Sequence, residues 1–343
     1  MMARRGETGG ANRSGRARPL AAQVFARLSD GHFHSGQALA EALHVSRGAV
    51  WKAVRALRSA GTIVHAVPNR GYRLPVAGEP IGAEHILERL PPTARAAVRD
   101  LQTLWQTDST NSVLLARANP PFGHSEVVLA EFQTAGRGRR GRTWLAPPGG
   151  AICLSLSWTF REVPRDLGAL GLAVGVCVLR ALRESGLEAE LKWPNDLLVK
   201  GRKLGGILIE LRAESAGPAC VIIGLGLNAA LGEPLLRQIA SLGLPATDLA
   251  SVGLSVSRNV IVAAILTHVL QGLRDFEREA LRPFIEGWRA ADALRGVQVD
   301  VHTPSGSVQG VARGIDLHGA LLIETAHGVQ RFISGDVTVR PVQ

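Results

Sequence analysis

Residues 136–142 combine glycine and arginine in a pattern that suits an anionic ligand. Four arginines and three glycines fall within these seven residues. Glycine leaves backbone N–H groups accessible, and a guanidinium group binds a carboxylate or phosphate with two parallel hydrogen bonds. The glycines at 136, 138 and 141 spell GxGxxG, but residues 147–150 read Pro-Pro-Gly-Gly where a dinucleotide-binding fold needs a helix, and no GK[ST] is present. We therefore expect a phosphate- or carboxylate-binding loop, with a solvated basic loop or a second nucleic-acid surface as the alternative.

A second segment places amines beside an amide and a carboxylate. Lys192-Trp-Pro-Asn195-Asp196 is followed at residue 201 by Gly-Arg-Lys203-Leu-Gly-Gly. The chain has 35 arginines and only four lysines, and these two motifs contain two of the four, Lys192 and Lys203. Across a tight hairpin both amines could reach an anion, and Asn195 and Asp196 could hold Mg²⁺ through oxygen. The alternative is an exposed Asn-Asp turn flanked by surface charge.

Two further segments could hold a polar ligand. Residues 106–111 read Gln-Thr-Asp-Ser-Thr-Asn immediately before a helix, so they are either helix-capping residues or groups that recognise a polar ligand head. Gly224 and Gly226 end an apolar strand and permit close backbone approach, and Asn228 supplies an amide there.

Other kinds of site find no support in the sequence. No serine lies in a GxSxG setting, and the ten histidines and three cysteines show neither HExxH nor CxxC spacing, so zinc is not indicated. The odd number of cysteines in apolar contexts predicts buried thiols in a reduced, cytoplasmic protein. The longest uncharged apolar run, residues 168–179, is too short to span a membrane, so no membrane association is expected.

The N-terminal quarter carries most of the net charge of +10. Residues 1–77 hold 12 basic and 3 acidic residues. Residues 1–18 are rich in glycine and arginine and predict a disordered basic tail. Three short helices and a hairpin are expected between residues 19 and 77, which is a winged helix-turn-helix, with a small helical interaction module as the alternative. The candidate DNA-binding residues are Ser46, Arg47, Lys52, Arg55 and Arg70.

Helical and strand patterns alternate through the rest of the chain. Strands are expected at 97–106, 126–132, 151–160, 188–193, 197–200, 204–211 and 219–228. Helices are expected at 112–118, 164–185 and 257–280. Short connections predict a mixed, largely antiparallel sheet with helices on one side. Turn signals from residue 296 onward predict a small β-barrel of about five strands.

Together, these segments resemble the bifunctional biotin–protein ligases that also repress the biotin operon. Ser35 to Arg47 and the wing Val67-Pro-x-x-Gly71-Tyr72 match the repressor-type members, and the similarity extends from about Leu20 to the C-terminus. The motifs occur in the family's order and spacing: Asp108-Ser-Thr-Asn111, Gln133-x-x-Gly-Arg-Gly-Arg-Arg-Gly-Arg142, Lys192-Trp-Pro-Asn-Asp196, Arg202-Lys-Leu-x-Gly206 and Gly224-x-Gly226-x-Asn228.

The resemblance implies a role for each motif residue. Biotin would be bound by Ser109, Thr110, Asn111, Gln133, Arg137, Gly138, Arg139 and Lys203. ATP and the adenylate would be bound by Arg142, Trp144, Lys192, Asn195, Asp196 and Asn228, with Mg²⁺ near Asn195 and Asp196. The catalytic residues would be Lys203, Arg139 and Lys192. Biotin and MgATP would give biotinyl-5′-adenylate and pyrophosphate, and a lysine of the biotin carboxyl carrier protein of acetyl-CoA carboxylase would then attack the adenylate.

The resemblance also implies an α+β architecture with three units. Residues 19–77 would form the winged helix-turn-helix, 78–292 a class II synthetase-like catalytic domain, and 293–343 an SH3-like β-barrel. Biotinyl-AMP would act as corepressor on operator DNA by promoting a homodimer through a sheet edge, which we place near residues 207–212. The alternatives are a biotin-sensing transcription factor without ligase activity and a lipoate-type ligase, which shares the fold.

Overall fold

The N-terminal helices form because apolar residues recur at helical spacing and serines end the preceding loops. In the computed structural model, Ser35 Oγ accepts the N–H of Ala38 (3.0 Å) and Ser46 Oγ that of Ala49 (3.2 Å). A short antiparallel hairpin follows, and the winged helix-turn-helix is as predicted. Its elements are α1 (Leu20–Leu28), α2 (Gly36–Ala42), α3 (Arg47–Ser59), β1 (His65–Val67) and β2 (Gly71–Arg73).

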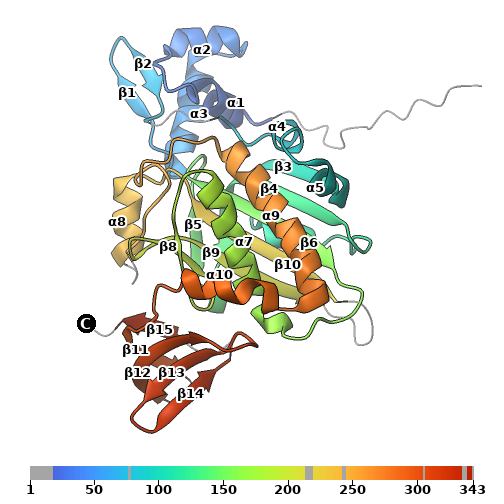
Figure 1. Cartoon of the computed structure of the whole chain (residues 1–343). Coiled ribbons are helices and arrows are strands. Elements are labelled where there is room, and N and C mark those ends of the chain that lie inside the picture. The colour runs from blue at the N-terminus through green and yellow to red at the C-terminus, as the bar shows by residue number, and fades with distance from the viewer. Residues whose placement is uncertain are drawn as a thin grey trace, which may run out of the picture.

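The structure describes residues 18–75, 79–212, 219–241, 245–303, 306–333 and 338–341. The predicted basic tail therefore lies outside the described residues, apart from Arg18. Within them, the chain forms three β-sheets in succession, with the winged helix at one end and the C-terminal strands at the other (Figure 1).

The central sheet is mixed, as predicted, and runs in the order β3-β4-β6-β10-β9-β8-β7, with β5 paired to β4. Among the pairs formed by its named strands in the described part of the chain, β3–β4 is parallel and the others are antiparallel. Its strands are β3 (Val98–Thr107), β4 (Ser125–Arg137), β5 (Thr143–Ala146), β6 (Ala151–Thr159), β7 (Glu190–Lys192), β8 (Asp196–Val199), β9 (Arg202–Arg212) and β10 (Cys220–Asn228).

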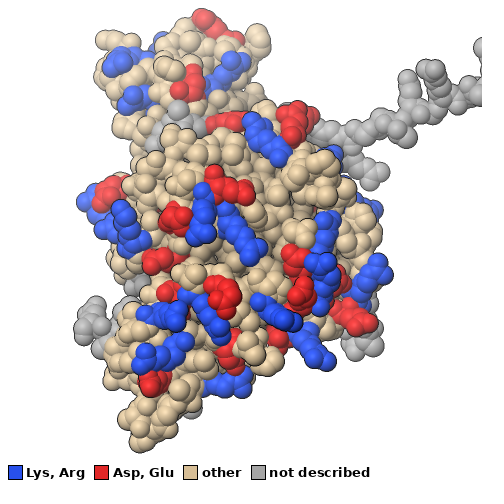
Figure 2. Space-filling model, in the orientation of Figure 1, with Lys and Arg blue, Asp and Glu red and all other residues tan. Residues whose placement is uncertain are grey.

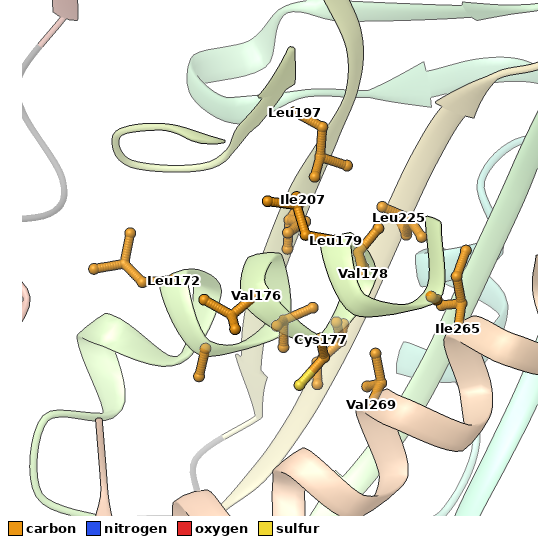
Figure 3. Close-up of a cluster of buried hydrophobic side chains, with 14 of the residues drawn as sticks. Leu172, Val176, Cys177, Val178, Leu179, Leu197, Ile207, Leu225, Ile265 and Val269 are labelled. Atoms are coloured by element: carbon orange, nitrogen blue, oxygen red, sulfur yellow. The ribbon is translucent and has the colours of Figure 1, made fainter. Parts of the chain in front are cut away.

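Two long helices cover one face of this sheet (Figure 1). They are α7 (Leu170–Glu184) and α9 (Arg258–Glu279), which also pack against α4 (Ala83–Leu87), α5 (Pro92–Ala97) and α10 (Ile285–Ala290). Figure 3 shows Val176 and Val178 of α7 beside Ile207 and Leu225 of the sheet and Ile265 of α9. This layer is the main hydrophobic core.

One helix departs from the predicted arrangement. We expected all helices on one side, but α6 (Thr110–Leu115) packs on the opposite face, where Leu114 contacts Val128, Cys220 and Ile222. It also begins two residues earlier than predicted, because Ser109 is its N-cap. The helix predicted at 164–185 begins at Leu170, after a 3₁₀ turn at Leu167–Ala169.

The C-terminal strands form a five-stranded antiparallel sheet in the order β14-β13-β12-β11-β15. Val299 and Val301 alternate inward, as their spacing predicts. Trp193 of the central unit donates its Nε1–H to Gly319 O (3.1 Å) and so ties the two units together. The strands are β11 (Gln298–Thr303), β12 (Gly306–Ile315), β13 (Leu321–Thr325), β14 (Gly328–Phe332) and β15 (Thr338–Pro341).

The winged helix rests against the central unit. The rings of Phe25 and Trp105 lie 5.5 Å apart, and Thr62 Oγ1 donates to Pro148 O (3.2 Å). On the face drawn in Figure 2, basic and acidic side chains intermingle over the central unit. This agrees with a net charge close to zero for the part of the chain after residue 77. No helix in the described part of the chain has the length and apolar character needed to cross a bilayer.

Candidate active site

A cavity of about 820 Å³ lies between the arginine-rich loop, the β7–β8 turn and the strands β9 and β10. It is lined by every residue that the family resemblance assigns to biotin or to the adenylate, although these residues come from segments as distant as positions 109 and 228. They are Ser109, Thr110, Asn111, Gln133, Arg137, Gly138, Arg139, Arg142, Trp144, Lys192, Asn195, Asp196, Lys203 and Asn228.

One end of the cavity is a buried polar network at the start of α6. Gln133 Oε1 accepts the backbone N–H (2.7 Å) and the hydroxyl (3.1 Å) of Thr110. The hydroxyl of Ser155 on β6 lies 2.6 Å from Thr110 Oγ1 and 2.5 Å from Asn111 Oδ1. Ser109, Thr110, Asn111 and Ser155 are all buried. Because the network fixes these donors and acceptors, it can recognise a neutral polar head group.

Asp108 supports this end without lining the cavity. Its carboxylate accepts the N–H of Ser109 (2.6 Å) and the hydroxyl of Thr107 (3.0 Å). The bond from the Ser109 N–H in particular holds the pKa of Asp108 below its ordinary value. The turn into α6 is therefore fixed by an ionised carboxylate.

A carboxylate that the sequence did not point to, Glu210, lies outside the cavity lining and contacts two residues that belong to it. Glu210 Oε2 on β9 accepts from Asn111 Nδ2 (2.7 Å) and from Arg137 Nη2 (3.1 Å). Arg137 is half-exposed and lines the cavity. Because Glu210 contacts both Arg137 and Asn111, it links the arginine-rich loop to α6. A glutamate in an apolar strand gives no sequence signal of such a role.

The arginine-rich loop crosses the mouth of the cavity as a tight turn. Gly138 N–H donates to Arg142 O (2.7 Å), and between them Arg139–Gly141 form one 3₁₀ turn in which Arg140 has a φ of 58°. A Cβ on Gly136 would lie 2.5 Å from Trp144 O, so the pairing of β4 with β5 requires glycine there. The pairing of β4 with β5 thus fixes the two ends of the loop, while Arg140 and Arg142 remain exposed.

The other end of the cavity holds the amines. Lys203 Nζ lies 2.5 Å from Asp196 Oδ1, and both side chains are largely buried. Lys192 is also buried. Asn195 Nδ2 donates to Ile207 O (2.9 Å), which leaves its Oδ1 for other partners. An anion placed here would meet concentrated positive charge in surroundings that screen it weakly.

An aromatic side chain closes this end. A Cβ on Gly226 would lie 2.4 Å from Trp144 Cε2, so the indole packs directly on the glycine backbone. The indole Nε1 is buried and has no hydrogen-bond partner among the described residues. Because Trp144 lines the cavity, a planar base could lie beside its ring.

The donor set also fits Mg²⁺ bound chiefly through a substrate. The described residues contain no group of three or more histidine, cysteine or acidic side chains that could hold a metal alone. Asp196 and Asn195 supply oxygens beside the amines. Mg²⁺ is commonly bound by one or two such oxygens together with phosphates and water.

Part of the wall comes from residues for which the sequence gave no motif. Gln238 and Ile239 of α8 (Glu233–Ser241) and Ala246 line the cavity. The segment that contains Ala246 pairs with β9, since Lys203 N–H donates to Pro245 O (2.8 Å). No motif singled out in the sequence lies between residues 231 and 249. Only the folding of this segment onto β9 brings its residues to the site.

The candidate DNA-binding residues, four of them basic, lie outside the cavity, and we call this exposed set the winged-helix face. Ser46, Arg47, Lys52, Arg55 and Arg70 are all exposed. The sequence reading did not select Trp51, which is 49% exposed on α3, with the guanidinium of Arg55 stacked 4.7 Å from the ring centroid. Such a face suits phosphates and base edges of a duplex.

Three family models match successive parts of the chain. They are the HTH domain over residues 21–73, the biotin/lipoate A/B protein ligase family over residues 105–228, and the biotin protein ligase C-terminal domain over residues 296–340.

Curated relatives match over most of the chain. The bifunctional ligase/repressor BirA of Escherichia coli is 33% identical over 94% of this chain and 97% of its own, and that of Bacillus subtilis is 31% identical over 92% and 96%. The solved biotin protein ligase of Aquifex aeolicus in complex with biotin and ATP has a TM-score of 0.61 at 28% identity, and covers 71% of this chain and 100% of that one.

Proposed function

The chain belongs to the biotin protein ligase family, and we propose that the cavity described above is the site at which it activates biotin. The protein is a biotin–protein ligase that uses ATP, and it is also a DNA-binding repressor of the winged helix-turn-helix type. The roles given below to individual residues are our proposal.

The first step joins two anions. A carboxylate oxygen of biotin attacks the α-phosphorus of ATP, and the bond from that phosphorus to the pyrophosphate oxygen breaks. Lys203 and Lys192 offset the repulsion between carboxylate and phosphate, and Arg139 extends the positive charge over them. Asp196 orients the Lys203 amine through their 2.5 Å contact. When bound, Mg²⁺ near Asn195 and Asp196 neutralises phosphate charge.

Substrate recognition divides between the two ends of the cavity. Ser109, Thr110, Asn111 and Gln133 hold the polar head of biotin. Arg137 and Gly138 cover biotin and the adenylate, and the adenine end is bound by Arg142, Trp144 and Asn228. The turn at residues 136–142 keeps water from the mixed anhydride.

The second step needs no nucleophile from this chain. A lysine amine of a carrier protein attacks the acyl carbon of biotinyl-AMP, AMP leaves, and an amide forms. This explains why the sequence contains no catalytic triad. We propose the biotin carboxyl carrier protein of acetyl-CoA carboxylase as the acceptor, as the name of the 37% identical relative from Mycobacterium tuberculosis suggests.

The convergence of all the assigned residues on one cavity carries this proposal. It is tested by pyrophosphate release that depends on both biotin and ATP, followed by biotin transfer to a purified carrier domain. Release without transfer would favour a biotin-sensing transcription factor. Equal turnover of lipoate would favour the lipoate-type alternative.

We propose that the adenylate promotes a homodimer through β9. This strand pairs with β8 only as far as Gly206, and Asn195 O accepts the N–H of Ile207 (3.0 Å). Beyond that point, residues 208–212 have no strand partner on this side within the described part of the chain, and Leu211 is 52% exposed. An open strand edge is a template for pairing with a second copy.

We further propose operator DNA as the partner of the winged-helix face and the cytoplasm as the place of action, where ATP, DNA and reduced thiols occur together. The proposed unit boundaries are 19–77, 78–292 and 293–343.

A further inference from the structure

The biotin end of the cavity depends on a helix too short to hold its own conformation. α6 has six residues, and an isolated helix of this length is not stable in water. Yet its first turn carries Thr110 and Asn111, whose positions define the proposed biotin-head site. Contacts from elsewhere must therefore fix this helix.

Arg212, the last residue of β9, binds the C-terminal end of α6. Its Nη2 donates to the carbonyls of Leu114 (3.0 Å) and Leu115, and its Nη1 donates to the carbonyl of Arg117 and to Asn119 Oδ1 (2.8 Å). The last carbonyls of a helix lack partners within the helix, and a cation is favourable at that end. One guanidinium thus donates to three backbone carbonyls in the turn that ends α6.

Glu210 binds the opposite end of the same helix. It lies two positions before Arg212, so both side chains project from the same face of β9. Its Oε2 accepts from Asn111 Nδ2 (2.7 Å) in the first turn and from Arg137 Nη2 (3.1 Å) in the arginine-rich loop. The carboxylate and the guanidinium therefore grip α6 at its two ends.

We propose that Arg212 is a positioning residue for biotin recognition: with Glu210 it clamps α6 so that Ser109, Thr110 and Asn111 face the cavity. Arg212 does not line the cavity, so it would act through α6 and not by contact with substrate. Since both clamp residues belong to the open edge of β9, the clamp also connects this edge to the biotin site. The inference rests on the proposed function of the cavity.

The test compares Arg212→Ala with Arg212→Lys in the pyrophosphate-release assay on the full-length protein. Loss of the guanidinium lets α6 shift, so we expect the KM for biotin to rise about tenfold or more, with the KM for ATP changed less than about twofold. Lysine keeps the charge and one donor group, so it should recover part of the loss. Arg183→Ala is the matched control, because Arg183 forms an exposed ion pair with Glu188 outside the cavity.

Several outcomes would overturn the clamp. A biotin KM within about twofold of native in folded Arg212→Ala, or equal increases for biotin and ATP, would do so. If Arg212→Ala does not fold, Glu210→Gln decides, since it weakens the other end and should also raise the KM for biotin selectively. A native protein without biotin-dependent pyrophosphate release would instead refute the proposed function.

Discussion

The cavity and the winged-helix face both present positive charge, but they hold it in different ways. In the cavity, Lys192 and Lys203 are largely buried, and Asp196 fixes the Lys203 amine. On the winged helix, Arg47 and Lys52 of α3 are both exposed. A buried charge with a fixed partner acts at one point with little screening, whereas exposed charges act together and are screened by salt. The same residue types can therefore act in the proposed catalysis in one region and in long-range attraction in the other.

Lys203→Ala should have the largest effect. Removing a fixed charge from the adenylation site costs about 3 kcal/mol, so we expect pyrophosphate release to fall by two orders of magnitude or more. The control is Lys200→Gln, which alters an exposed lysine three residues away. Unchanged turnover in Lys203→Ala would remove the role that we give to this amine.

Combined Arg47→Ala and Lys52→Ala should weaken DNA binding without affecting ligation. Each lost phosphate contact should make the slope of log K against log salt shallower by about 0.9, and affinity should fall about tenfold or more at low salt. Anisotropy of labelled duplex DNA across a salt series measures both. Arg165→Ala, an exposed arginine of the central unit, is the control. If ligation fell together with DNA binding, the two regions would not act independently, which would contradict the comparison.

Gly226→Ala should impair the nucleotide end of the cavity. The new methyl would lie 2.4 Å from Trp144 Cε2, so the indole must move. Such overpacking costs about 1–3 kcal/mol, which we expect as a higher KM for ATP. Gly168→Ala introduces a methyl with no heavy atom within 4 Å and should behave as native. An equal KM for ATP in both variants would show that the packing of Trp144 on Gly226 does not contribute to nucleotide binding.

The cysteines should show the smallest effect, because none takes part in the reaction. Burial raises the pKa of Cys153 and of Cys177 to about 12, and it also raises the pKa of Cys220. All three thiols therefore stay protonated at pH 8, and a thiol reagent should label them slowly in the native protein and completely in urea. Rapid labelling of native protein would show that the core beneath the cavity opens more readily than its packing indicates.

Candidate ligand-binding residues that lie close together along the chain could be predicted from the sequence. The glycine and arginine pattern of residues 136–142 identified the loop, and Lys192, Asn195, Asp196 and Lys203 lie within a dozen residues of one another. The helix-turn-helix followed from capping serines and apolar spacing. These signals are local, because adjacent residues cooperate within one turn or hairpin.

Supporting residues were not visible in the same way. Ser155, Glu210 and Arg212 are polar residues that alternate with apolar ones in strands, and Gln238 belongs to an amphipathic helix. Their partners lie tens of residues away, for example 99 positions between Asn111 and Glu210. The placement of α6 on the face opposite α7 was likewise missed, since a six-residue helix shows too little periodicity to reveal which face it covers.

The sequence alone determined which groups we propose for the chemistry: the arginine-rich loop, the lysine hairpin, the polar turn before α6 and the basic helix of the winged unit. The tertiary structure decided how these groups are held. It brought the assigned residues into one cavity, left residues 208–212 as an open edge, and set Glu210 and Arg212 at the two ends of α6. The physical reason is that residue type fixes charge and hydrogen-bonding capacity, whereas the partner of a buried polar group depends on strand register and on which sheet face a helix covers.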